Sequence, residues 1–194
     1  QQLRVSAQYG YETFQAALGG ASDSKERGGA FMDRLILMRH GKAERDSKSG
    51  EDFDRKLTDR GVRESAAMAA NLADLGLVPD IALVSAAQRT RETWAAAQGA
   101  FPTCAARFER MLYLAEERLV RELAEAAGQS SRTVMVVGHN PGLQELAIRL
   151  LSEGSAPAPL IARAHAAFPT AAAAVFLFDA AGRPAYDGLF FPRG

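Results

Sequence analysis

The 194-residue sequence has few or none of several features that mark particular protein classes. Its single cysteine, Cys104, excludes an internal disulfide and a cysteine-based zinc cluster. Its longest apolar stretch, Ala171 to Phe178, is far shorter than the roughly 18 to 20 residues of a membrane-spanning helix. Lysine plus arginine equal aspartate plus glutamate at 23 each, so no general polyanion-binding surface is indicated. We therefore expect a cytoplasmic protein that binds neither nucleic acid nor a membrane.

Residues 1–31 lack the pattern of a folded segment. They contain no basic region followed by an apolar run, so they do not resemble a secretory signal, and the polar stretch 22–27 between glycine pairs is typical of a linker. Met32 opens the first patterned segment. We predict an N-terminal extension or linker over 1–31 and one domain over 32–194, because 47% hydrophobic content at this length suits a single core.

Short β-prone apolar runs alternate with longer helical patterns from residue 34 onward. This alternation predicts an α/β fold, a three-layer α/β/α sandwich with a mainly parallel central sheet. The expected strands are 35–38, 81–84, 106–109, 133–137, 175–178 and 185–190. The expected helices are 58–75, 88–98, 116–127 and 140–151.

Residues that favour helix starts precede three of these helices. Thr58, Ser85 and Asn140 are expected N-caps, and Pro141 suits a first turn, where its missing N–H costs nothing. One face of the helix from residue 58 is expected to be apolar, with Val62, Ala66, Ala69 and Ala73 on it.

Two of the three histidines directly follow expected strands. Arg39-His40-Gly41 follows 35–38, and Gly138-His139-Asn140 follows 133–137. In open α/β sheets, ligands bind at the carboxyl ends of the strands. Arg89 lies about one turn beyond the end of strand 81–84 and can reach the same edge. We therefore expect Arg39, His40, Arg89 and His139 to surround one site.

Two histidines and two arginines suit a phosphoryl group. Guanidinium forks match phosphate oxygens bidentately and stay charged at any working pH. The neighbouring cations disfavour protonation of His40, so its neutral ring can attack phosphorus. Attack by Nε2 requires that a carbonyl or carboxylate hold Nδ1, and the sequence does not identify that partner. Gly41 would let backbone amides approach the phosphate.

Four segments resemble the histidine phosphatase (phosphoglycerate mutase-like) superfamily in order and spacing. They are LILMRHGKA at 35–43, Leu57-Thr58 with Gly61, SAAQRTRET at 85–93 and VVGHNPG at 136–142. Within the superfamily the chain is most similar to the small SixA-type phosphohistidine phosphatases, which dephosphorylate histidine phosphotransfer domains of bacterial signalling relays. The resemblance implies that His40 is the phosphorylated nucleophile, that Arg39, Arg89 and His139 complete the phosphate pocket, that phosphate is a product, and that no metal or cofactor is needed.

The short loops predict a shallow site that is open to a phosphorylated side chain on another protein. Imidazole leaves from phosphohistidine with little added proton, so a missing acid is tolerable. Glu116 or Glu117 is a candidate proton donor, although a solvated helix start is the plainer interpretation, as it is for Asp52 and the other acidic residues of the loop after His40. Two alternatives stay open: the same chemistry on a small phosphoester, phosphoserine or phosphothreonine, and a non-catalytic phosphate-binding module.

Overall fold

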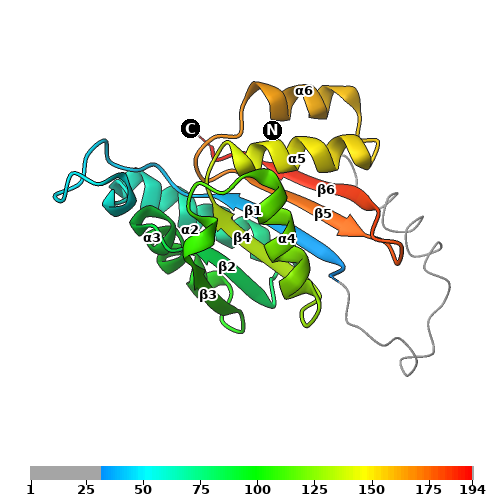
Figure 1. The fold of residues 1–194 in the computed structure, drawn as a ribbon, viewed down its shortest axis with the longest axis horizontal. Helices are drawn as coiled ribbons and strands as arrows, with labels where there is room; N and C mark the ends of the chain where they lie inside the picture. Colours follow the sequence, from blue (N-terminus) through cyan, green and yellow to red (C-terminus); the bar gives the residue numbers. More distant parts are fainter. Residues whose placement is uncertain (1–31, 194) are drawn as a thin grey trace.

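The computed structural model describes residues 32–193, which form a six-stranded sheet covered by helices on both faces (Figure 1). The predicted extension over 1–31 lies outside the described residues. The strands are β1 (Arg34–Arg39), β2 (Ile81–Ser85), β3 (Ala105–Glu109), β4 (Thr133–Gly138), β5 (Ala173–Phe178) and β6 (Pro184–Phe190). The helices are α2 (Asp59–Asp74), α3 (Gln88–Ala97), α4 (Glu117–Gly128), α5 (Gly142–Glu153) and α6 (Ala158–Ala166), with short 3-10 helices η1 (Asp52–Asp54), η2 (Gln98–Ala100) and η3 (Arg110–Leu112).

The strand order in the sheet is β3-β2-β4-β1-β5-β6. Strands β3, β2, β4 and β1 pair in parallel, whereas β5 runs antiparallel to β1 and β6 antiparallel to β5. β1 and β4 lie inside the sheet, and their unbroken apolar sequences suit strands that are buried on both faces. The predicted mainly parallel sheet is therefore confirmed.

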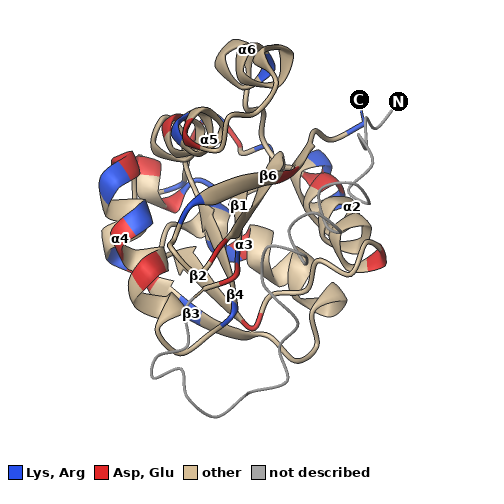
Figure 2. Ribbon diagram, turned by 90° about the vertical axis from the view of Figure 1, so that its right-hand side faces the viewer, with Lys and Arg blue, Asp and Glu red and all other residues tan. Residues whose placement is uncertain are grey.

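Two apolar clusters, one on each face of the sheet, make the three layers. On one face, Ile36 and Met38 of β1 pack with α2 and α3. On the other face, Leu35 and Leu37 pack with α4 and α5, and α6 lies outside α5 (Figure 2). Within residues 32–193, every helix is too short or too polar to span a bilayer.

The start of α2 packs against the turn after β1. Thr58 is its N-cap, as expected, and accepts a hydrogen bond from Gly61 N at 3.1 Å. The expected apolar face is partly wrong, because Ala69 is buried but Val62 is 43% exposed. The helix turns Gly61 and Ser65 inward because a Cβ on Gly61 would strike the backbone of Lys42. The buried residues of α2 are Gly61, Ser65, Met68, Ala69 and Leu72.

Two expected N-caps are also wrong. Pro141, not Asn140, is the N-cap of α5, because the Asn140 amide instead donates to Phe168 O at 3.0 Å. Ala87, not Ser85, is the N-cap of α3, because the Ser85 hydroxyl bonds to His139. In both cases a long-range polar contact takes the side chain away from the local helix end. Helix α6 has no counterpart among the expected elements.

Candidate active site

His40 lies at the carboxyl end of β1 and is 6% exposed. Its Nδ1 is 2.7 Å from the carbonyl oxygen of Gly41. Because a carbonyl oxygen only accepts hydrogen bonds, Nδ1 carries the ring proton in the neutral form and Nε2 keeps a free lone pair. The tether that the sequence could not identify is therefore the backbone of the next residue.

Gly41 fills a position that has no room for a side chain. A Cβ there would lie 2.5 Å from both Gly61 O and Ser65 Oγ of α2. Its N–H donates to Thr93 Oγ1 of α3 at 3.0 Å, and that hydroxyl donates to Arg89 O at 2.7 Å. Helices α2 and α3 therefore fix the carbonyl group that orients the imidazole of His40.

His139 follows β4, and its ring centroid lies 5.3 Å from that of His40. Its Nε2 is 2.7 Å from Ser85 Oγ, which also accepts a long hydrogen bond from Ala87 N at 3.5 Å. We assign the Ser85 hydroxyl as the donor to Nε2, which places the ring proton of His139 on Nδ1. This Nδ1 is buried and has no hydrogen-bond partner within the described chain.

Arg39 and Arg89 bring two guanidinium groups to the histidines. Arg39 Nη1 donates to Phe168 O at 2.9 Å. Arg89 is 2% exposed. Both of its terminal nitrogens donate to Asp52, Nη1 to the backbone oxygen at 2.8 Å and Nη2 to Oδ2 at 3.0 Å. The Nε atoms of both arginines are buried without a partner among residues 32–193. Since buried donors are normally bonded, these Nε–H groups and His139 Nδ1 suit a bound anion.

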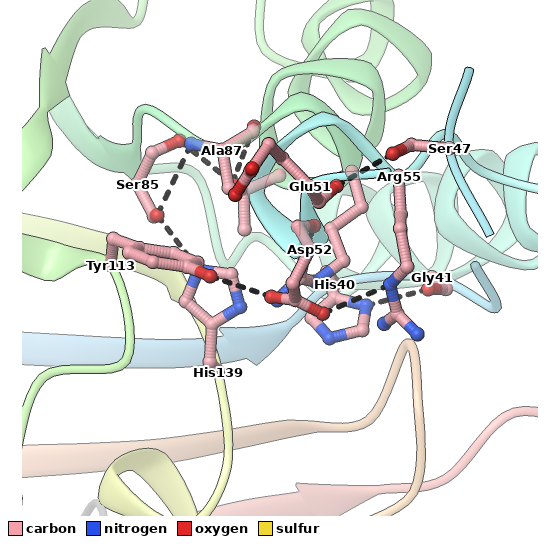
Figure 3. Close-up of polar contacts among 12 residues, drawn as sticks. His40, Gly41, Ser47, Glu51, Asp52, Arg55, Ser85, Ala87, Tyr113 and His139 are labelled. Atoms are coloured by element: carbon pink, nitrogen blue, oxygen red, sulfur yellow. Dashed lines mark hydrogen bonds and ion pairs between the residues drawn. The ribbon is translucent and has the colours of Figure 1, made fainter. Parts of the chain in front are cut away.

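Asp52, in η1, reaches the site although its sequence suggested a solvated residue. Its Oδ2 also accepts a hydrogen bond from the Tyr113 hydroxyl at 2.6 Å, and its Oδ1 lies 3.0 Å from Arg55 Nε (Figure 3). The carboxylate is therefore held by Arg89, Arg55 and Tyr113 together. The spacing of Asp52 from the other site residues carries no signal. Only the need of a buried arginine for a carboxylate partner could have pointed to it.

Tyr113 is a second site residue that the sequence did not reveal. Its ring meets the ring of His139 edge-on, with centroids 5.6 Å apart, and the ring of Phe53 at 4.9 Å. Arg89 Cζ lies 5.8 Å from the same ring. The segment after β3 therefore closes one side of the cluster with an aromatic wall whose hydroxyl holds Asp52.

Both histidines are neutral at pH 7. Burial lowers the pKa of His40 to about 4, with Arg89, Arg39 and Arg55 adding to the effect and the bond to Gly41 opposing it. Burial also lowers the pKa of His139 to about 3, assisted by His40 and Arg89. The sequence suggested the arginines as the cause, whereas burial is the larger one. The hydrogen bond from Tyr113 lowers the pKa of Asp52, which is therefore ionised.

The two expected proton-donor candidates lie at the start of α4. Glu117 is in an ion pair with Arg149 of α5, and Glu116 is the exposed residue before α4. Within the described chain, neither forms a hydrogen bond or ion pair with His40 or the other site residues, so a donor role for either stays a prediction. Residues 32–193 contain no group of three His, Cys, Asp or Glu placed to bind a metal ion, and the expectation that no cofactor is needed also stays a prediction.

Known proteins share both the sequence and the fold of this chain. A model of the histidine phosphatase superfamily, branch 1, matches residues 35–113. A solved SixA-type protein of Agrobacterium tumefaciens, assigned as a phosphohistidine phosphatase, is 31% identical, with a TM-score of 0.73 over 84% of this chain and 99% of that one. The chain belongs to the histidine phosphatase superfamily. The predicted family is confirmed, as is its phosphoglycerate mutase-like fold.

Two further proteins are similar to this chain, one in structure and one in sequence. The protein histidine phosphatase SixA complexed with tungstate is 25% identical to this histidine phosphatase, with a TM-score of 0.65 over 82% of this chain and 97% of that one. An uncharacterized chloroplast protein of Arabidopsis thaliana is 33% identical over 127 residues. The match covers 60% of this chain but only 58% of that relative. Family and structural neighbours together identify this enzyme as a phosphatase with a SixA-like architecture.

Proposed function

We propose that this histidine phosphatase removes phosphoryl groups from phosphohistidine in proteins, through a phosphoryl group carried transiently by His40. The observation that carries the proposal is the bond from Nδ1 to Gly41 O, which leaves Nε2 as the free nucleophilic nitrogen. The neutral state of His40 at pH 7 supports the same role, because a protonated ring has no lone pair to offer.

In the first step, Nε2 of His40 attacks phosphorus and the bond from phosphorus to the substrate's imidazole nitrogen breaks. The bonding pair stays on that nitrogen, and the ring, protonated on its other nitrogen, leaves as neutral imidazole. The negative charge spreads over three phosphoryl oxygens during transfer. The unpartnered Nε–H groups of Arg39 and Arg89 and the Nδ1–H of His139 supply donors for those oxygens without rearrangement of the site.

In the second step, water attacks phosphorus and the bond to Nε2 of His40 breaks. Inorganic phosphate leaves, and the ring of His40 returns to its neutral form with its proton still on Nδ1. The same three donors serve both steps, because the phosphoryl group changes only the atoms at its two apical positions.

The protonation state of Asp52, the carboxylate beside the site, supports phosphohistidine as the substrate. An alkoxide leaving group requires a positioned acid, whereas imidazole leaves readily without one. Asp52 contacts Arg89, but its lowered pKa keeps it ionised, so at neutral pH it has no proton to donate. A histidine phosphotransfer domain of a signalling relay is the corresponding partner.

The test is turnover of a phosphorylated histidine phosphotransfer domain beside a panel that contains phosphoserine peptides and small phosphoesters. We expect His40→Ala to abolish release of phosphate while His165→Ala, a matched change at an exposed histidine of α6, leaves it intact. Rapid quenching with radiolabelled substrate should trap acid-labile label on the wild-type enzyme and none on His40→Ala.

Two results would overturn parts of the proposal. Wild-type rates in a folded His40→Ala variant would end the nucleophile assignment. Faster turnover of a small phosphoester or a phosphoserine peptide than of every phosphohistidine domain would assign the same chemistry to a different substrate class.

A further inference from the structure

Three exposed apolar side chains gather in one short segment beside the site. Phe108, Met111 and Leu114 are 44%, 60% and 52% exposed. They are three of the five large apolar side chains that are exposed within residues 32–193, and they fall within seven consecutive positions. Clustered exposed apolar groups on a soluble protein mark interaction surfaces more often than scattered ones.

The segment borders the catalytic cluster. Phe108 and Glu109 end the edge strand β3 opposite Val84 and Ser85, and Ser85 is the partner of His139. Tyr113 lies between Met111 and Leu114 in sequence, and its ring contacts His139. The apolar side chains therefore continue the surface outward from the aromatic wall of the site.

Unpaired cations lie along the same border. Arg91 stacks over the ring of Phe108 at 4.5 Å, and Arg110 lies over the ring of Phe53 at 5.2 Å. Neither guanidinium forms an ion pair with a carboxylate in the described part of the chain. The border thus combines apolar contact area with two cations that have no ion-pair partner within residues 32–193, which complements a partner surface that is apolar and acidic.

The backbone holds Leu114 outward at a cost. Its φ is 50°, a left-handed conformation that is unfavourable for a bulky residue. The preceding 3-10 turn fixes this geometry, with Tyr113 N donating to Arg110 O at 3.1 Å. A strained residue whose side chain is half exposed gains little from the core, so its placement suits a contact with another molecule.

We propose that Phe108, Met111 and Leu114 form a docking surface for the folded protein that carries the phosphohistidine. This proposal rests on the proposed function. For phosphorus to reach Nε2 of His40, the body of the substrate protein must cover the border of the site. A small phosphate compound ends before it reaches this border. The partner therefore presents an apolar patch with acidic neighbours beside its phosphohistidine.

The experiment compares one protein substrate with one small substrate. The variants are Met111→Ser and Leu114→Asn, singly and combined, since asparagine tolerates the left-handed backbone. Matched controls are Val62→Ser and Val78→Ser, which change apolar side chains that are 43% and 38% exposed elsewhere. The probes are a panel of histidine phosphotransfer domains phosphorylated with phosphoramidate, and phosphoramidate itself.

We expect the double variant to lose about tenfold or more in kcat/KM for the phosphorylated domains, mainly through KM, with phosphoramidate turnover unchanged. Arg110→Glu should lower kcat/KM for the domains further at low salt than at high salt. Equal KM in the double variant and the controls would overturn the docking surface alone. An equal loss on both probes would also overturn it, because the site itself would then be disturbed. A wild-type enzyme that hydrolyses phosphoramidate but none of the domains would refute the proposed function and the docking surface together.

Discussion

Replacement of Asp52 by asparagine is the sharpest test of how this site is held together. The side chain keeps its size, and the backbone oxygen that accepts from Arg89 Nη1 stays in place. What disappears is the negative charge that Arg89, Arg55 and Tyr113 share. In the wild type, the bond from Nη2 to Asp52 holds the guanidinium of Arg89 so that its Nε–H stays available for the phosphoryl group. The variant loses that bond.

The size of the effect follows from the type of bond and its exposure. A hydrogen bond to a charged group contributes about 1.5–3 kcal/mol. The Asp52 side chain is 48% exposed, so solvent screening places the loss at about 1.5 kcal/mol, the lower end. If the loss falls on the transition state, kcat decreases about tenfold. Phosphate should meanwhile bind more tightly, because Arg89 and Arg55 are no longer partly neutralised.

The assay is steady-state kinetics with inorganic phosphate as product inhibitor, together with calorimetry of phosphate binding. Asp54→Asn is the matched control, because Asp54 lies in the same 3-10 helix, is exposed, and accepts a hydrogen bond from Ser49 Oγ at 2.6 Å. Tyr113→Phe should move kcat and phosphate affinity in the same directions by less. The reasoning fails if Asp52→Asn behaves like Asp54→Asn, or if kcat and phosphate affinity fall in parallel.

Two further predictions concern the histidines. Ser85→Ala removes the hydroxyl that holds Nε2 of His139 and frees the ring to change tautomer, so kcat should fall about tenfold. The unfolding free energy should fall by about 1–3 kcal/mol, because Nε2 is left buried without a partner, and an unchanged kcat would exclude this role. Because the pKa of His40 is lowered from 6.5 to about 4, the unfolded state binds a proton that the folded state does not between those values. The free energy of unfolding, measured with urea, should therefore fall as the pH drops from 6.5 to 4. The fall should be roughly 3 kcal/mol larger in the wild type than in His40→Asn. Equal pH dependence of the unfolding free energy in the two proteins would contradict a buried neutral ring.

The sheet and the four converging residues could be predicted because they depend on local patterns and one rule of topology. The strands around Leu37 and Val136 are unbroken apolar runs, and the carboxyl ends of parallel strands meet at one edge. Arg39, His40 and His139 inherit their positions from those strand ends. Their placement required no knowledge of side-chain contacts.

Asp52 and Tyr113 could not be predicted because irregular segments place them. The loop after β1, cyan in Figure 1, and the turn after β3 take conformations that their contacts with buried groups determine. The predicted inward face of α2 was partly wrong for a related reason. Close approach to Gly41 demanded small residues there, and Val62 was left exposed despite its apolar side chain.

The position of β1 in the sheet makes its pairing depend on segments that are synthesised much later. The strand that carries His40 is flanked by β4 and β5, which emerge from the ribosome long after it. A nascent chain that ends before Ala173 contains β4 and His139 but lacks β5, the antiparallel neighbour on the other side of β1. Truncation before Ala173 would therefore leave one edge of the strand that precedes His40 unpaired.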